Sequence, residues 1–242
     1  MRNIKLTIEY DGKDFNGWQK QPNKLNIQGE IERSIKDITG EDVDLIASGR
    51  TDAGVHALGQ VANFKTDSNI PVEKIPIALN TKLKRSIRIL AAEEVDERFH
   101  SRYNCKKKTY KYVINNSANG TAIYRNLEYN FSQELNVDKM NEAVKYFIGE
   151  HDYKLFTTAK KSKSTVRNIE DIQIEHKGNE VTIRIIANDF MHNMARLMVG
   201  MLLDVGGGLK KPETVKDALE LKSVTMSFPA EAYGLFLEKV NY

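Results

Sequence analysis

One short segment of the sequence combines the residue types that acid–base or nucleophilic chemistry requires. Residues 48–56 read Ser-Gly-Arg-Thr-Asp-Ala-Gly-Val-His and directly follow an apolar stretch. Asp52 supplies a carboxylate, which can act as a nucleophile or a base while it is ionised, and Gly49 and Gly54 allow backbone conformations that other residues avoid. Polar loops at strand ends commonly carry functional residues. A turn in which Asp52 merely caps a neighbouring amide explains the segment equally well at this point.

A run of basic residues with aromatic residues among them is the second feature that could do chemistry, by binding a charged partner. Its members are Arg98, Arg102, Lys106, Lys107, Lys108 and Lys111, with Phe99, Tyr103 and Tyr110 between them and no acid. Basic side chains neutralise phosphates and aromatic rings stack on unpaired bases, so the run suits RNA. A solvated strand and loop is the alternative, because charge runs alone are weak signals.

The overall charge leaves RNA binding open without requiring it. The net charge is +3, from 36 basic and 33 acidic residues. A second stretch without acids carries Lys154, Lys160, Lys161, Lys163 and Arg167. The distribution of charge along the chain is therefore more informative than the net charge.

The composition excludes several classes of protein and of site. The 242 residues are 40% hydrophobic and 29% charged, which is ordinary for a globular protein with a sizeable core. No stretch approaches the roughly 20 apolar residues of a membrane span, and residues 1–7 do not resemble a signal peptide, so we expect a cytoplasmic protein. Cys105 is the single cysteine, and the five histidines lack metal-ligand spacing, so neither a disulfide nor a metal site is expected.

Hydrophobic periodicity predicts the elements that must position these residues. Strands are predicted at residues 4–10, 43–48, 60–65, 87–95, 109–114, 166–175, 181–187 and 235–242, and helices at 27–40, 71–83, 137–148, 191–205 and 212–221. Residues 206–211, Gly-Gly-Gly-Leu-Lys-Lys, lack the spacing of a phosphate-binding loop and follow a helix, so we interpret the glycines as its terminator. Strands and helices mix without regular alternation, which indicates the α+β class.

Residues 49–57, Gly-Arg-Thr-Asp-Ala-Gly-Val-His-Ala, resemble the signature of the tRNA pseudouridine synthase A family. The resemblance continues in order along nearly the whole chain. The further matching segments are residues 8–12, 15–19, 28, 59–61, 98–102, 108–112, 149–153, 166–167, 190–196, 199–200, 234–237, 240 and 242. The length of this ordered series makes a chance match a poor explanation.

The resemblance implies a pseudouridine synthase fold. In that fold two α+β halves share a central, largely antiparallel sheet, and the active-site cleft lies between the halves. We expect residues 1–105 to form the N-terminal half, with the catalytic Asp loop, and residues 106–242 to form the C-terminal half, with Tyr110 and Arg196.

The resemblance also implies a reaction that needs no cofactor. Family members isomerise uridine to pseudouridine at positions 38–40 of the tRNA anticodon stem-loop: the bond from N1 to the ribose breaks, and C5 is joined to the ribose instead. The residue at the Asp52 position is essential, but whether it attacks the base, attacks the sugar or acts as a base stays open. Family members are homodimers, so tRNA and a second copy of the chain are the expected partners.

Further roles follow from the same resemblance. Arg196 would keep Asp52 ionised, and Tyr110 would stack on the flipped uracil or take part in proton transfer at C5. Arg50 would fill the gap left by the displaced nucleotide, with a simple phosphate contact as the alternative. Leu235 would line the uracil pocket or else pack in the core. The remaining residues expected to bind RNA are Arg102, Lys106, Lys107 and Lys108.

The sequence departs from the family pattern at three places. Asp189 stands where the family usually has a small residue, Ala195 replaces a valine, and residues 222–232 match only loosely. None of these changes affects Asp52, Tyr110 or Arg196. We therefore expect them to bear on the choice of RNA target more than on the type of reaction.

Three alternatives remain open. The same reaction could take place at another tRNA site or in ribosomal RNA. A non-catalytic RNA-binding protein on this fold predicts that Asp52→Asn changes nothing measurable. A metal-dependent hydrolase that uses Asp52 predicts loss of activity with a chelator, although no second carboxylate is suitably spaced near Asp52.

Overall fold

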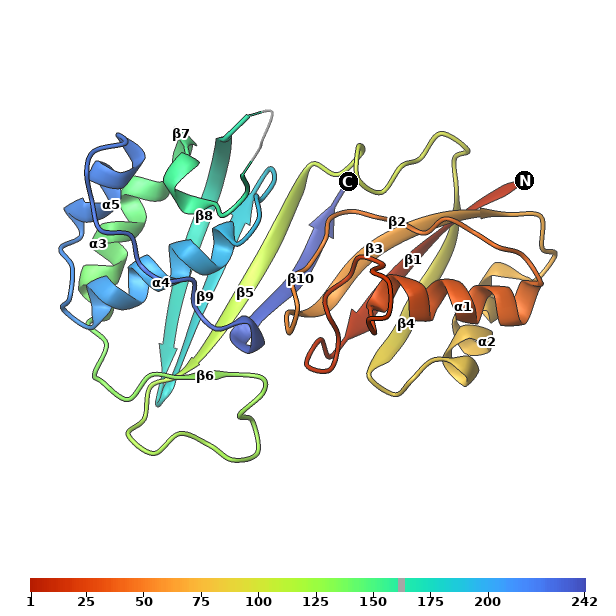
Figure 1. Cartoon of the computed structure of the whole chain (residues 1–242), viewed down its shortest axis with the longest axis horizontal. Helices are drawn as coiled ribbons and strands as arrows, with labels where there is room; N and C mark the ends of the chain where they lie inside the picture. Colours follow the sequence, from red (N-terminus) through yellow and green to blue (C-terminus); the bar gives the residue numbers. More distant parts are fainter. Residues whose placement is uncertain (161–163) are drawn as a thin grey trace. The chain divides into compact units, whose positions relative to one another are not determined.

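The computed structural model describes residues 1–160 and 164–242 and divides into two compact units (Figure 1). Met1–Lys106 and Phe236–Tyr242 form the first unit, and Lys107–Leu235 forms the second. The end of the chain belongs to the first unit because β10 (Leu235–Asn241) pairs in parallel with β3 (His56–Thr66). Lys161 and Lys163 of the second basic stretch lie outside the described residues.

The sheet of the first unit is built around β1 (Arg2–Tyr10). β1 pairs antiparallel with β3 on one side and with β4 (Ile87–Val95) on the other, and the short β2 (Ile46–Ala47) pairs antiparallel with β3. Ile4, Leu6 and Ile8 are fully buried. The alternating apolar residues of β1 therefore face the core, because successive side chains of a strand point to opposite faces of the sheet.

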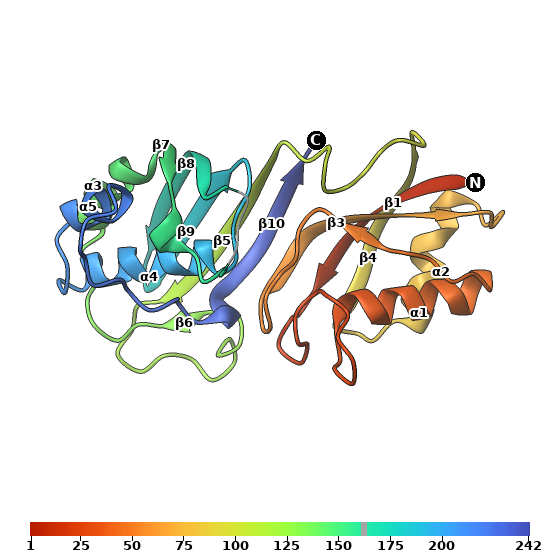
Figure 2. The ribbon, with the colours of Figure 1, turned by 45° about the horizontal axis from the view of Figure 1, so that its top comes forward.

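Two helices pack against each other on one face of this sheet (Figure 2). α1 (Ile27–Thr39) begins where the Asn26 side chain accepts a hydrogen bond from the Gly29 amide, and it ends at Gly40 with φ 79°. Its apolar stripe of Ile27, Ile31 and Ile35 is buried. The 3₁₀ turn η1 (Val72–Lys74) leads directly into α2 (Ile75–Lys82).

The second unit contains a sheet with the strand order β5-β9-β8-β7, in which all three pairings are antiparallel. The strands are β5 (Lys107–Asn115), β9 (Glu180–Ala187), β8 (Val166–Lys177) and β7 (Gly149–Asp152), and the short β6 (Tyr129–Asn130) pairs in parallel with β5. Gly178, with φ 60°, makes the turn between β8 and β9. The predicted hairpin is confirmed.

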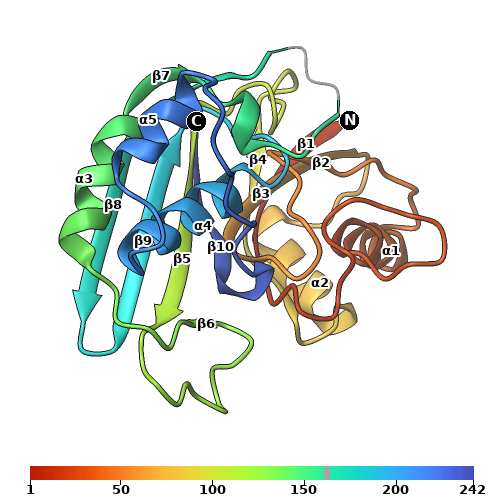
Figure 3. The same cartoon turned by 60° about the vertical axis from the view of Figure 1, so that its left-hand side comes forward.

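Three helices gather on one face of the second sheet (Figure 3). They are α3 (Val137–Phe147), α4 (Met194–Gly206) and α5 (Glu213–Leu219), accompanied by the 3₁₀ turns η2 (Lys154–Phe156) and η3 (Ala232–Gly234). α4 is almost entirely buried and ends in the run of three glycines, where Gly208 has φ 79°. The glycines therefore terminate a helix, as the sequence predicted.

The α+β prediction is confirmed, because helices pack on largely antiparallel sheets in both units. Several predicted elements differ in extent. The strand at residues 43–48 is reduced to β2, the strand at 60–65 begins four residues earlier as β3, and the helix at 191–205 begins only at Met194. Asn193, with φ 60°, cannot continue a right-handed helix, so it separates α4 from the preceding loop. Within the described ranges, no helix is long and apolar enough to span a membrane.

Candidate active site

The loop that carries Asp52 is tied to the sheet of the first unit by buried hydrogen bonds. Thr51 Oγ1 lies 2.7 Å from the hydroxyl of Tyr10, the last residue of β1. The hydroxyl of Ser48 donates to Gln60 Oε1 at 2.7 Å, and Gln60 Nε2 donates to the Gly49 carbonyl at 3.0 Å. Strands β1 and β3 therefore both hold the loop, each through a polar side chain.

Burial keeps the Tyr10 hydroxyl neutral in this arrangement. Desolvation raises the pKa of Tyr10 well above its ordinary value, while hydrogen bonds to Thr51 and Gln60 partly offset that rise. A neutral phenol can donate one hydrogen bond and accept another. Tyr10 therefore anchors the Asp52 loop without adding a second charge beside the carboxylate.

A second loop, residues 11–19, presses closely against the Asp52 loop. The Trp18 amide donates to the Thr51 carbonyl at 3.1 Å. Gly17 has φ 81°, and a Cβ at Gly17 would lie 2.6 Å from the Thr51 carbonyl oxygen. A Cβ at Gly12 would lie 1.9 Å from the Val55 carbonyl oxygen. Both glycines are therefore required by close backbone approach.

Asp52 itself is half-buried at the turn of the loop formed by residues 48–56. Its carbonyl accepts a hydrogen bond from the Val55 amide at 3.2 Å, and Gly54 follows with φ 79°. Arg50, two residues earlier, is exposed. The loop thus carries one cation accessible to solvent and one partly shielded carboxylate on a fixed backbone.

His56 also supports the loops of the first unit, a role that the sequence did not predict. It is 1% exposed, its Nδ1 accepts from the Gly12 amide at 3.0 Å, and its ring stacks on Phe236 with centroids 4.8 Å apart. Asp11 Oδ1 lies 3.1 Å from the same nitrogen. His56 therefore joins the loop of residues 11–19 to β3 and to the last strand, which is a positioning role.

Tyr110 and Arg196 lie in the second unit, on different elements. Tyr110, on β5, is 8% exposed, and its ring meets the Phe190 ring edge-on at 4.8 Å. Arg196, in the first turn of α4, donates from Nε to the Ala230 carbonyl at 2.6 Å and from Nη1 to Asn193 Oδ1 at 3.0 Å. Both acceptors are uncharged, so they orient the guanidinium without neutralising it.

The loop between β9 and α4, residues 188–193, connects these two side chains. Phe190 packs on Tyr110, and Asn193 accepts from Arg196. Both residues lie in segment 190–196, which resembles the family, but the resemblance assigned neither of them a role. The signal available was their position in the chain, directly before Arg196.

Leu235 follows a tightly packed corner of the second unit. Its side chain is buried, and a Cβ at the preceding Gly234 would lie 2.7 Å from the Tyr112 ring. The Tyr112 hydroxyl donates to the Glu231 carbonyl at 2.9 Å, and burial is the main cause that raises the Tyr112 pKa, whereas the charge of Arg196 lowers it. The approach to Leu235 is therefore fixed by contacts with β5.

The four expected RNA-binding cations of the basic run occupy different environments. Arg102 and Lys106 are exposed. Lys107 Nζ lies 2.8 Å from Glu170 Oε1, and Lys108 Nζ lies 2.6 Å from Asp189 Oδ1. Only 8% of the Lys108 side chain is exposed. The structure thus departs from the simple picture of an accessible basic strip, because two of its three consecutive lysines are neutralised by acids.

Each unit, taken by itself, carries groups that could do chemistry or bind an anion. Asp52 and Arg50 share one loop of the first unit, and Tyr110, Arg196 and Leu235 belong to the second. No group of three or more His, Cys, Asp or Glu side chains that could hold a metal ion occurs in the described part of the chain.

The chain is similar to known proteins along its whole length. The family model described as tRNA pseudouridine synthase matches residues 6–104 and 143–242. The chain is 48% identical over 244 residues to tRNA pseudouridine synthase A of Caldicellulosiruptor bescii and 49% identical over 244 residues to that of Caldicellulosiruptor saccharolyticus. It is 48% identical over 246 residues to tRNA pseudouridine synthase A 2 of Clostridium perfringens. Each of these alignments covers 100% of both chains.

Proposed function

Because the chain belongs to the tRNA pseudouridine synthase family, we propose that it isomerises uridine to pseudouridine in tRNA, with Asp52 as the catalytic carboxylate. The observation that supports Asp52 most directly is the way its loop is held. Hydrogen bonds with Tyr10, Gln60 and Trp18 hold Gly49 and Thr51, directly before it. A catalytic group gains from such support, because misplacement by a fraction of an ångström lowers the rate.

The proposed reaction is an isomerisation, in which one bond between base and ribose replaces another, and it needs no cofactor. The bond from N1 of uracil to C1′ of the ribose breaks, the base turns, and a bond forms from C5 to C1′. The proton on C5 is released and N1 gains one, so atoms and electrons balance. An ionised Asp52 can serve in three ways: it can attack the base, attack the sugar, or remove a proton from the sugar.

Tyr110, Arg196 and Leu235 complete the proposed site. Tyr110 would stack on the flipped uracil or carry the proton at C5. Arg196 would keep the carboxylate ionised, and its two neutral hydrogen-bond acceptors leave its charge available for that role. Leu235 would contact the base through its apolar side chain. The proposal therefore draws on both halves of the chain, residues 1–105 and residues 106–242.

The proposed RNA contacts follow from exposure. Arg50, Arg102 and Lys106 are exposed, so they are the cations best suited to contact the tRNA or fill the space of the displaced nucleotide. Lys107 and Lys108 would contribute less, because each must first leave an acidic partner. We expect the unpaired charges to dominate the salt dependence of binding.

The target that we propose is positions 38–40 of the anticodon stem-loop, as in the family that the sequence resembles. Flipping a base costs a few kcal/mol and costs least where the base is poorly stacked. We further propose that the enzyme works in the cytoplasm as a homodimer.

The test is tritium release from tRNA transcripts labelled at uridine C5. The wild-type chain should release tritium, and Asp52→Asn should release none, whereas Asp44→Asn, at an exposed acid eight residues earlier, should behave as wild type. A chelator should not alter the rate. Release from Asp52→Asn would refute the role of Asp52, and release only from ribosomal RNA or from another tRNA site would redirect the assignment.

A further inference from the structure

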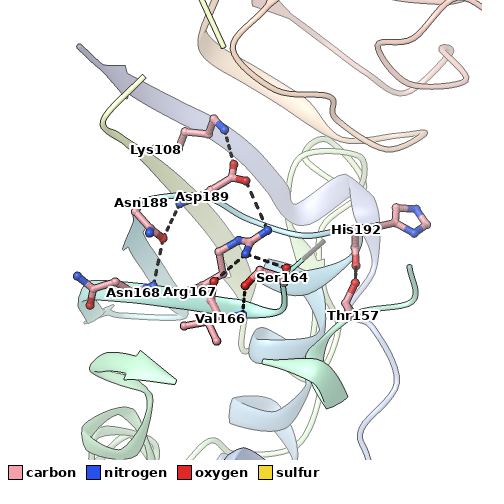
Figure 4. A network of polar contacts seen from close by, with 9 residues as sticks. All are labelled: Lys108, Thr157, Ser164, Val166, Arg167, Asn168, Asn188, Asp189 and His192. Atoms are coloured by element: carbon pink, nitrogen blue, oxygen red, sulfur yellow. Dashed lines mark hydrogen bonds and ion pairs between the residues drawn. The ribbon is translucent and has the colours of Figure 1, made fainter. Parts of the chain in front are cut away.

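A carboxylate lies between two cations beside the proposed site in the second unit (Figure 4). Asp189 Oδ1 is 2.6 Å from Lys108 Nζ, and Asp189 Oδ2 is 3.7 Å from Arg167 Nη2. The Lys108 side chain is 8% exposed and that of Arg167 is 15% exposed. Asp189 therefore compensates two largely buried positive charges that come from β5 and β8.

The backbone around Asp189 is fixed as well. Asn188 Oδ1 accepts from the Asn168 amide at 3.1 Å and from the Asp189 amide at 2.8 Å, and the Asn188 amide donates to the Asn168 carbonyl at 3.1 Å. At the other end of the loop, the His192 carbonyl accepts from Thr157 Oγ1 at 3.1 Å. These contacts hold residues 188–192 against β8 and the segment after η2 (Figure 4).

The anchored loop carries the ring that contacts Tyr110. Phe190 follows Asp189 directly and meets Tyr110 edge-on, with centroids 4.8 Å apart. Lys108 precedes Tyr110 by two residues on β5, so the two side chains leave the same face of the strand. The pair of Lys108 with Asp189 and the pair of Tyr110 with Phe190 are therefore neighbouring links between one strand and one loop.

We propose that Asp189 is a positioning residue, which holds Phe190 against Tyr110 and so fixes the Tyr110 ring for the reaction. This proposal rests on the role of Tyr110 proposed above. A neutral small residue at position 189 could not anchor the loop through charge.

The Asp189 carboxylate should also weaken RNA binding, whereas its positioning of Tyr110 should favour the reaction. Its negative charge cancels part of the basic run that would otherwise attract phosphates. Loss of the charge should therefore slow the chemical step without weakening RNA binding. A residue that contacted RNA favourably would show the reverse pattern, a higher KM.

The first experiment is steady-state kinetics of Asp189→Asn on tRNA. We expect kcat to fall about tenfold or more, since small errors in position are costly, and KM for tRNA to stay unchanged or fall. The matched control is Glu170→Gln, which removes the acid paired with the adjacent Lys107 at 2.8 Å and leaves the pair of Lys108 with Asp189 in place. Its kcat should remain at the wild-type value.

A second measurement reports the ring without using activity. Protein labelled with 3-fluorotyrosine gives a fluorine NMR signal for Tyr110, which is assigned by its absence in Tyr110→Phe. The signal should shift or broaden in Asp189→Asn and stay in place in Glu170→Gln. This readout separates the two proposals: a chain without synthase activity would refute the proposed function while the spectrum still tests the positioning.

A double variant separates positioning from general stability. Asp189→Asn alone leaves Lys108 as a largely buried charge without its partner, which destabilises the fold. Lys108→Met combined with Asp189→Asn removes one of the two charges that Asp189 compensates, so the melting temperature should recover in part, while kcat and the Tyr110 signal should remain altered. Recovery of kcat together with the melting temperature, or an unshifted Tyr110 signal in Asp189→Asn, would overturn the proposal.

Discussion

The hydroxyl of Tyr10 lies 2.7 Å from Thr51 Oγ1, and this bond joins the end of β1 to the residue directly before Asp52. Both side chains are buried. Water cannot readily replace a partner that is lost there, so the bond contributes to the stability of the loop and to its position.

Tyr10→Phe should therefore lower both stability and rate. An unsatisfied Thr51 hydroxyl costs about 1–3 kcal/mol of unfolding free energy, and we expect kcat to fall several-fold with KM unchanged. Urea unfolding and tritium release measure the two effects. Tyr153→Phe is the control, because Tyr153 is equally buried and donates to the Phe147 carbonyl at 2.6 Å in the second unit. It should lose similar stability and keep kcat.

Gly17→Ala should impair the Asp52 loop much more than the matched change Gly40→Ala. The two glycines have similar φ values, 81° and 79°, but a Cβ at Gly17 would lie 2.6 Å from the Thr51 carbonyl oxygen, whereas nothing lies within 4 Å at Gly40. The cost of the positive φ alone is about 1–2 kcal/mol. Chemical denaturation and kcat should show an additional loss for Gly17→Ala, and equal effects would contradict the close approach.

Arg196→Lys should reduce kcat even though it keeps the positive charge. Lysine is a point charge and cannot bond to Ala230 and Asn193 at once in the fixed geometry of a guanidinium. We expect a loss of about 100-fold, the scale of a misplaced catalytic group. Asn193→Gly allows the same backbone φ of 60° and removes only one hydrogen-bond acceptor of Arg196, so kcat should fall less. Wild-type kcat in Arg196→Lys would show that charge alone suffices.

The free energy of unfolding should fall as the pH rises above about 10, the ordinary pKa of tyrosine. Burial raises the pKa values of Tyr10, Tyr112 and Tyr153 in the folded protein. The unfolded chain therefore loses these protons at a lower pH than the folded chain does. The contribution to stability is complete below the unfolded pKa and is lost as the pH rises toward the folded value.

Urea midpoints measured from about pH 8 to 11 should reveal this loss. Tyr112→Phe should show a shallower decline than wild type, because one of the titrating groups is gone. An identical slope in the two proteins would contradict the assignment to Tyr112.

Lys106→Gln should reduce the salt dependence of RNA binding, and Lys108→Gln should not. A lysine that neutralises one phosphate contributes about one unit to the slope of log K against log salt. Lys106 is exposed, whereas Lys108 is paired with Asp189 at 2.6 Å. Fluorescence anisotropy with labelled tRNA at several salt concentrations measures the slopes. A larger change for Lys108→Gln would mean that this lysine turns from Asp189 to the RNA.

The sequence predicted those elements whose signals are local. Helix α1 is one such case, because Ile27, Ile31 and Ile35 repeat at helical spacing and Gly40 supplies the left-handed residue at its end. The hairpin of β8 and β9 is another, since its turn and its two apolar runs are contiguous in the chain. α4 was predicted three residues too long at its start, because contacts from elsewhere in the fold hold residues 188–193 as a loop.

The candidate site residues could be named from the sequence, whereas the side chains that hold them could not. Asp52, Arg50, Tyr110 and Arg196 could be named from the sequence, because their segments resemble a family signature. The partners that hold them could not be predicted: Tyr10 is 41 residues from Thr51, Ala230 is 34 from Arg196, and Asp189 is 81 from Lys108. Periodicity and turn chemistry act over a few residues, whereas these contacts depend on which strands become neighbours. The amino-acid sequence thus determined the local elements and the candidate reactive groups, and only the tertiary structure decided which side chains orient, shield or neutralise them.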